Sequence, residues 1–196
     1  MKKQYHILSN VVSKEVCEFL ETYFIEKEQV AKLYLDSSFI SKFNKEYGHF
    51  NDPQLPGTYA IYGSLAGDLI LKQLKLLVEK TIKKKLYEMY SYTGVFNTRN
   101  SLQRQKGEVK GAVSAVLNLS KKEWPIHIKH KALVLKLGDM IVYQESVLEH
   151  WRLPLVEGKC VQLFLHYIDV KAKNSKKHKY DSRPRLGVDK LIQNGG

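Results

Sequence analysis

Apolar residues recur at helical spacing in two segments of the N-terminal part of the chain. Over residues 14–28 they return every three or four positions, and Ser13 stands in front of them as a helix N-cap. A broader apolar stripe over residues 64–86 ends in lysines, which the negative end of a helix dipole favours. The prolines and the glycine of residues 51–57 argue against regular structure between these helices. Residues 1–86 are therefore predicted to be a mostly helical support.

From Tyr87 onward the apolar pattern changes to that of strands, and aromatic and β-branched residues become frequent. We expect strands over residues 87–96, 111–120, 127–137, 138–144 and 159–168. Short strands that follow two helices predict an α+β domain, in which a β-sandwich or open barrel carries the N-terminal helices packed on one sheet. The polar and basic residues 171–196 are expected to form a partly mobile tail on the surface.

The composition fits a single folded domain without a membrane span. The chain has 196 residues, of which 43% are hydrophobic, and it can therefore bury a core. No apolar run approaches the roughly 20 residues that a membrane span requires, and residues 1–16 lack the apolar block of a secretory signal. Cys17 and Cys160 resemble neither a disulfide framework nor a metal site. We therefore expect a cytoplasmic protein that does not associate with membranes.

The net charge of +12 makes an anionic partner plausible without identifying one. Lysines cluster at residues 83–85, 121–122 and 171–179. Such a surface can bind nucleic acid or another anion, and it can also simply keep a protein in solution. The sequence contains neither an aromatic-interleaved RNA-binding motif nor a Cys/His finger. Nucleic-acid binding through the lysine-rich surface is therefore a prediction from charge alone.

The segment LEHWRLP places His150 directly before an apolar strand, with Trp151 and Arg152 after it. Further segments occur in a fixed order around it: YAIYG at 59–63, LYEMYSY at 86–92, VSAVLNLS at 113–120, WPI at 124–126, LGDMIVY at 137–143, VQLFLHYID at 161–169 and DSRPRLG at 181–187. In this order and at these spacings, the chain resembles the Fe(II)/2-oxoglutarate dioxygenase superfamily in its prolyl-hydroxylase-like branch. The resemblance covers roughly residues 59–188. It implies a double-stranded β-helix, also called a jelly roll or cupin-like barrel.

The resemblance implies one domain over residues 1–196, with its β-helix core in residues 87–170. It places His150 at the second metal-binding histidine of the family. The family's earlier His-x-Asp motif should lie between YSY and VSAVLNL, and spacing places it at Gln105, Lys106 and Gly107. Gln105 offers only a neutral amide oxygen and Gly107 offers no side chain, whereas ferrous iron in this family needs two histidines and a carboxylate.

This departure predicts a degenerate, non-catalytic relative of the dioxygenases that acts as a binding protein. With His150 as a vestigial ligand, neither Fe(II) nor 2-oxoglutarate is expected as a cofactor. Changing Gln105 to histidine and Gly107 to aspartate should then restore metal affinity. The alternative is an active hydroxylase that uses Fe(II) and 2-oxoglutarate with His150 plus Glu108. That alternative requires a one-residue shift, which turns a strand side chain to the other face.

Three residues are candidates for binding a 2-oxo acid or another small anion. Lys159 lies nine positions after His150, close to where the family carries a basic residue for the distal carboxylate. The other candidates are Arg152 and Tyr92. Each residue also has a purely structural interpretation. Lys159 could be a solvated lysine in a turn, Arg152 could stack near Trp151, and Tyr92 could belong to the core. The expected ligand is an unknown small anion or a protein.

His166 lies inside an apolar strand, where a histidine more often belongs to the core than to a ligand site. Arg104 or Lys106 could instead reach inward and occupy the place of the lost metal.

Overall fold

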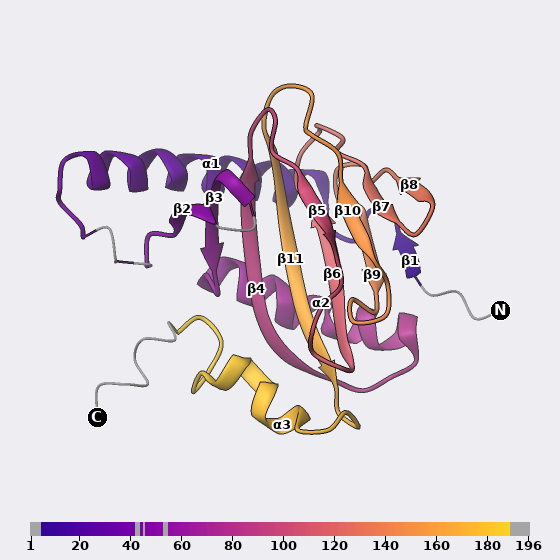
Figure 1. Cartoon of the computed structure of the whole chain (residues 1–196). Helices are drawn as coiled ribbons and strands as arrows, with labels where there is room; N and C mark the ends of the chain where they lie inside the picture. Colours follow the sequence, from indigo (N-terminus) through magenta and orange to yellow (C-terminus); the bar gives the residue numbers. More distant parts are fainter. Residues whose placement is uncertain (1–4, 42–43, 45, 53–54, 189–196) are drawn as a thin grey trace.

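The computed structural model describes residues 5–41, 44, 46–52 and 55–188. Two antiparallel sheets lie face to face, and two long helices cover the outer face of the larger sheet (Figure 1). This arrangement confirms the predicted α+β jelly roll with helices packed on one sheet. Within the described residues, no helix is long and apolar enough to cross a membrane.

The elements have the following bounds. The helices are α1 (Lys14–Asp36), α2 (Leu65–Ile82), the short α3 (Ser175–His178) and the 3-10 helix η1 (Lys179–Ser182). The large sheet consists, in spatial order, of β1 (Tyr5–Leu8), β9 (Met140–Tyr143), β6 (Ala112–Asn118), β11 (Cys160–Asp169), β4 (Leu86–Phe96), β3 (Leu55–Tyr62) and β2 (His49–Asp52). The small sheet consists of β5 (Leu102–Gln105), β10 (His150–Arg152), β7 (Ile126–Ile128) and β8 (Lys131–Leu133).

Both long helices begin at serines, whose side chains accept a backbone hydrogen bond in the first turn. The Ser13 hydroxyl accepts from the Val16 N–H, which confirms the predicted N-cap, and the Ser64 hydroxyl accepts from the Gly67 N–H. α1 continues to Asp36, eight residues beyond the predicted end. The apolar faces of both helices pack on the large sheet and form the main core with it.

Strand β11 separates that core from the space between the sheets. Its residues Val161, Leu163, Leu165 and Tyr167 are buried in the core beneath the helices. Because strand side chains alternate between faces, Phe164 and His166 point toward the small sheet. The Tyr167 hydroxyl donates a hydrogen bond of 2.7 Å to the Leu71 carbonyl and so ties β11 to α2. The result is a strand that is apolar on one side and lines a cavity on the other.

Two predicted segments differ from the structure. Asn51 and Asp52 end strand β2 and Leu55 begins β3, whereas irregular structure was expected over residues 51–57. Pairing between the two strands supplies backbone partners that local composition does not reveal; residues 53 and 54 lie outside the described residues. The strand expected over residues 127–137 is interrupted by a turn, because Lys129 adopts a left-handed conformation with φ of 56°. β7 and β8 therefore form a hairpin.

Residues 171–188 lie on the surface, as expected for the tail, but are anchored to the fold; residues 189–196 of the expected tail lie outside the described residues. The Arg183 side chain is buried, and its Nη1 pairs with Asp68 Oδ2 of α2 at 2.9 Å. Its Nη2 donates to the Met89 carbonyl of β4 at 3.1 Å. The Gly187 N–H also donates to Asp68 Oδ2, at 2.8 Å. This buried ion pair fixes the C-terminal segment against α2 and β4.

Candidate functional site

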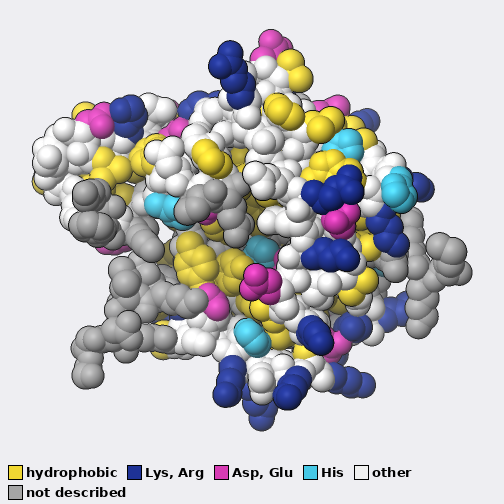
Figure 2. Space-filling model, viewed as in Figure 1, with side chains coloured by type: hydrophobic (Ala, Val, Ile, Leu, Met, Phe, Trp, Pro, Cys, Tyr) yellow, Lys and Arg dark blue, Asp and Glu magenta, His cyan; other side chains and the backbone are white. Residues whose placement is uncertain are grey.

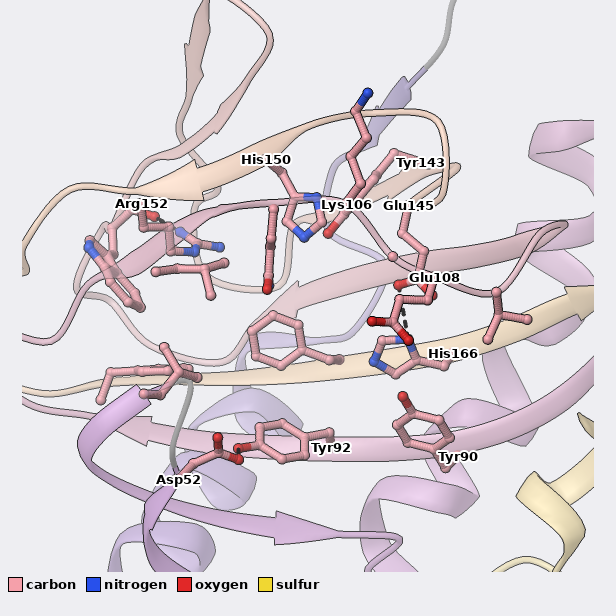
Figure 3. Close-up of a pocket in the computed structure, with 18 residues that line it drawn as sticks. Asp52, Tyr90, Tyr92, Lys106, Glu108, Tyr143, Glu145, His150, Arg152 and His166 are labelled. Carbon is pink, nitrogen blue, oxygen red and sulfur yellow. Dashed lines mark hydrogen bonds and ion pairs between the residues drawn. The ribbon is translucent and has the colours of Figure 1, made fainter.

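A cavity of about 410 Å³ lies between the two sheets. Its walls come from β4 and β11 of the large sheet, from β5 and β10 of the small sheet, and from the segments after β5 and β9 (Figure 3). The molecular surface is hollowed near the centre of the view, where hydrophobic, acidic and histidine side chains lie together (Figure 2). Several residues that the sequence singled out, among them His150 and Arg152, line this cavity.

The structure brings together the three positions at which the resemblance leads us to expect metal ligands. In the pairing of β10 with β5, His150 lies directly across from Gln105. Gly107 follows two residues later, and its N–H donates to the Glu145 carbonyl at 3.0 Å. All three motif residues line the cavity. The strand pairing therefore brings His150, Gln105 and Gly107 to one wall of the cavity.

His150 presents one ring nitrogen to the cavity. Its side chain is buried, and Nδ1 lies 3.1 Å from the Leu148 carbonyl. Because a carbonyl only accepts, Nδ1 carries the proton and Nε2 holds the free lone pair. Burial lowers the pKa of the His150 ring, which favours the neutral form. A single histidine of this kind is a competent metal ligand if further donors stand beside it.

Glu145 fills the space beside Gly107. A Cβ atom added at Gly107 would lie 2.6 Å from Cγ of Glu145, closer than such atoms normally approach. The Glu145 carboxylate accepts a hydrogen bond from the Ser114 hydroxyl and lies 3.3 Å from Nδ1 of His166. Burial alone would raise the pKa of Glu145, but His166 and the two hydrogen bonds lower it to about 2. An ionised carboxylate thus occupies the place of an aspartate side chain at position 107.

His166 has hydrogen-bond partners but does not lie in the core as expected. Its Nδ1 contacts Glu145 and also the Ser114 hydroxyl, the latter at 3.0 Å. The ring stacks on Tyr90, with 4.4 Å between centroids and 25° between planes. It lines the cavity because it belongs to the face of β11 that points away from the helices. Sequence reasoning missed the Glu145–His166 pair, which no local motif announces.

Arg152 is a buried cation with unused hydrogen-bond donors. Its side chain is only 2% exposed, and Nη1 donates to the Trp124 carbonyl. The guanidinium lies 4.7 Å from the centre of the Trp124 ring, so the stacking partner is not the expected Trp151. Within the described part of the chain, Nε and Nη2 have no hydrogen-bond partner. Burial lowers the pKa of Arg152 to about 10, so the group is still protonated at neutral pH.

The other two anion candidates differ in position. Lys159 pairs with Glu28 of α1 and is not among the residues that line the cavity. Tyr92 does line it, and its hydroxyl donates to Asp52 Oδ2 at 2.9 Å. Tyr92 and Arg152 therefore line the same cavity, whereas Lys159 lies elsewhere. No ligand is present, so binding of an anion by any of the three remains a prediction.

The residues expected to fill the metal position lie elsewhere. Arg104 is on the outside of the small sheet, 3.2 Å from Glu149 and stacked on Trp151 at 3.9 Å. Lys106 lines the cavity, but Figure 3 shows its ammonium group directed away from the interior. Glu108 is exposed and also lines the cavity. The position beside His150 is approached by Glu145 rather than by a cation.

The histidine and carboxylate side chains of the described residues do not form a cluster of three. Nowhere in residues 5–41, 44, 46–52 or 55–188 do three His, Cys, Asp or Glu side chains form a group that could hold a metal ion. A facial triad requires two imidazoles and a carboxylate around one point. Here the carboxylate of Glu145 is engaged by His166 and Ser114 instead.

Comparison with known proteins identifies the fold. No protein-family model and no curated protein matches the sequence. Among solved structures, a prolyl-4-hydroxylase from Pseudomonas putida superposes with a TM-score of 0.62 at 12% identity, covering 86% of this chain and 93% of its own. A viral collagen prolyl hydroxylase from Paramecium bursaria Chlorella virus-1 gives 0.61 at 11% identity, over 87% and 98% of the two chains.

HygX from Streptomyces hygroscopicus, solved with nickel and 2-oxoglutarate bound, gives a TM-score of 0.58 at 11% identity over 86% of this chain and 84% of its own. At such identities the likeness defines the fold and leaves the activity of this chain open. The chain has the double-stranded β-helix fold of the 2-oxoglutarate- and Fe(II)-dependent oxygenases.

Proposed function

We propose that this protein is a non-catalytic relative of the 2-oxoglutarate-dependent oxygenases that binds a small organic anion between its two sheets. The observation that carries the proposal is the buried Arg152 guanidinium, whose Nε and Nη2 have no partner among the described residues. A buried charged group whose donors lack hydrogen-bond partners destabilises the folded protein by roughly several kcal/mol. A carboxylate that accepts hydrogen bonds from Nε and Nη2 would remove that cost. Arginine is suited to this because its fork matches a carboxylate or phosphate.

The loss of iron chemistry is supported by the residues at the metal motif. Gln105 and Gly107 stand at the expected ligand positions, and Glu145 fills the space beside Gly107. His150 is then the one remaining ligand of the family's set. Without the other two ligands, we expect ferrous iron to bind weakly and hydroxylation not to occur.

An active hydroxylase remains the second candidate, because Glu108 and His150 line the same cavity. It predicts one tightly bound Fe(II) or Mn(II) per chain and conversion of 2-oxoglutarate to succinate. Measuring metal stoichiometry and succinate formation on the purified protein separates the two candidates.

The partner and the compartment are proposed on weaker grounds. The lysine-rich surface around residues 83–85 and 171–179 is a proposed contact for nucleic acid. Part of its charge is already paired, since Lys84 and Lys85 contact Asp169 and Glu79. We propose a cytoplasmic location, which agrees with two free buried cysteines.

The test of anion binding is a calorimetric titration with succinate, glutarate, 2-oxoglutarate and phosphate, without metal. We expect at least one carboxylate to bind, and Arg152→Met to weaken that binding by tenfold or more, because charge-assisted hydrogen bonds would be lost. Lys159→Met is the matched control, since Lys159 lies outside the cavity. Absence of binding by all four anions, or equal affinity in Arg152→Met, would refute the proposal.

A further inference from the structure

We infer that the ligand is a dipolar molecule, with an anionic group at Arg152, a cationic amine at Glu145, and an apolar segment between them. This inference rests on the proposed function and adds the chemical class of the ligand.

The two charges lie at opposite ends of the cavity. In Figure 3, Arg152 is at one end, and Glu145, Glu108 and His166 are together at the other. The Trp124 ring that carries Arg152 packs on Phe96, which lies across from Cys160 in the register of β4 and β11. His166 is six residues further along β11, about 20 Å at the strand rise of roughly 3.3 Å per residue. The long side chains cover part of this distance, and the remaining space suits an extended ligand.

Two carboxylates, Glu145 and Glu108, lie at one end of the cavity, and the ammonium group of Lys106 points away from it (Figure 3). Both polar contacts of the Glu145 carboxylate are made through Oε2, with Ser114 and His166. Oε1 therefore has no hydrogen-bond partner in the described part of the chain. Glu108 is a second carboxylate in the cavity wall, and among the described residues it forms no ion pair. An ammonium group at this end would gain a charge-assisted hydrogen bond to Oε1 and attraction from Glu108.

The wall between the two charged ends is poorly solvated. Tyr143 and His150 both line the cavity and are buried, and their rings meet edge to face with 5.2 Å between centroids. Figure 3 shows His150 between Arg152 and Glu145. In such a space an oriented dipole is stabilised more strongly than in water.

Aromatic rings line the middle of the cavity. Tyr92 and Phe164 meet edge to face, with 6.0 Å between centroids, and Phe164 lies 6.2 Å from Phe96. Tyr90 stacks on His166 at the negative end. These rings provide an apolar wall for a hydrocarbon segment.

The experiment compares ω-amino acids with carboxylates of the same chain length. The amide spectrum of ¹⁵N-labelled protein is titrated with 4-aminobutyrate, 6-aminohexanoate and 8-aminooctanoate, and with butyrate, hexanoate and octanoate. At the best-fitting length, we expect the amino acid to bind at least tenfold more tightly than its matched carboxylate. Glu145→Gln should remove most of this gain and Glu108→Gln part of it. Glu149→Gln, which alters an exposed carboxylate outside the cavity, should leave the gain unchanged.

The outcomes separate this inference from the proposed function. If carboxylates bind through Arg152 but the amine adds nothing at any length, the inference is overturned and the proposed function stands. A gain that persists in both Glu145→Gln and Glu108→Gln would also overturn it. If none of the six probes binds and the anion titrations are silent too, both proposals fall.

Discussion

Glu145 and Gly107 fit each other at the place where the related fold would hold a metal. A side chain at position 107 would collide with Cγ of Glu145, and the Glu145 carboxylate is engaged by Ser114 and His166. We therefore expect that restoring two ligands at positions 105 and 107 will not by itself restore metal affinity, unlike the prediction made from the sequence alone. The space for an aspartate at position 107 has to be created first.

The double change Gln105→His with Gly107→Asp is expected to leave Mn(II) affinity near that of the natural sequence, because Glu145 blocks the new carboxylate. Adding Glu145→Ala should raise the affinity at least tenfold, since His150 and both new ligands can then converge. Calorimetric titration with Mn(II) measures both variants. Equal, tight binding by the double and triple variants would show that Glu145 is no obstacle.

Sequence reasoning located half of this site. His150, Arg152, Gln105 and Gly107 were accessible because they belong to an ordered series of short segments. Glu145 and His166 were not, because their contact depends on strand register. Tyr143 of β9 pairs with Ser114 of β6, which in turn pairs with His166 of β11. No spacing within one segment encodes a contact that crosses three strands.

At the scale of elements, strong periodicity gave reliable predictions and short strands did not. The two long helices and the strands β4, β6, β9 and β11 carry clear apolar patterns. β5 and β10 are short and lack an apolar run such as that of β9, so no strand pattern is recognised in them, although they hold Gln105 and His150. The C-terminal segment was misjudged because its polar composition conceals one buried ion pair.

That ion pair gives a prediction about the docking of residues 171–188. Asp68→Asn should lower the free energy of unfolding by about 3–5 kcal/mol, because Arg183 would be left buried without a counter-charge. Urea unfolding of the full chain measures the change. The control is Glu149→Gln, which removes an exposed ion pair with Arg104 and should change stability by less than about 1 kcal/mol. A similar loss in both variants would contradict the role assigned to Asp68.

At the scale of the whole molecule, the two faces of the large sheet have different tasks. The face toward the helices is a continuous apolar core that includes Leu71, Val78, Val161 and Leu163. The face toward the small sheet mixes aromatic rings with ionisable groups around a cavity. Stability can therefore rest on one side of the sheet while the residues on the other side vary.

The unsatisfied donors of Arg152 mean that the empty protein should be thermally weaker than the occupied one. A ligand at 100 times its dissociation constant adds about 2.7 kcal/mol. For a domain of this size, that corresponds to a rise in melting temperature on the order of 5–10 °C. A thermal-shift screen of metabolite mixtures is thus a direct route to the natural ligand, with Arg152→Met as the background that should not respond. Equal shifts in both proteins would point to a different binding place.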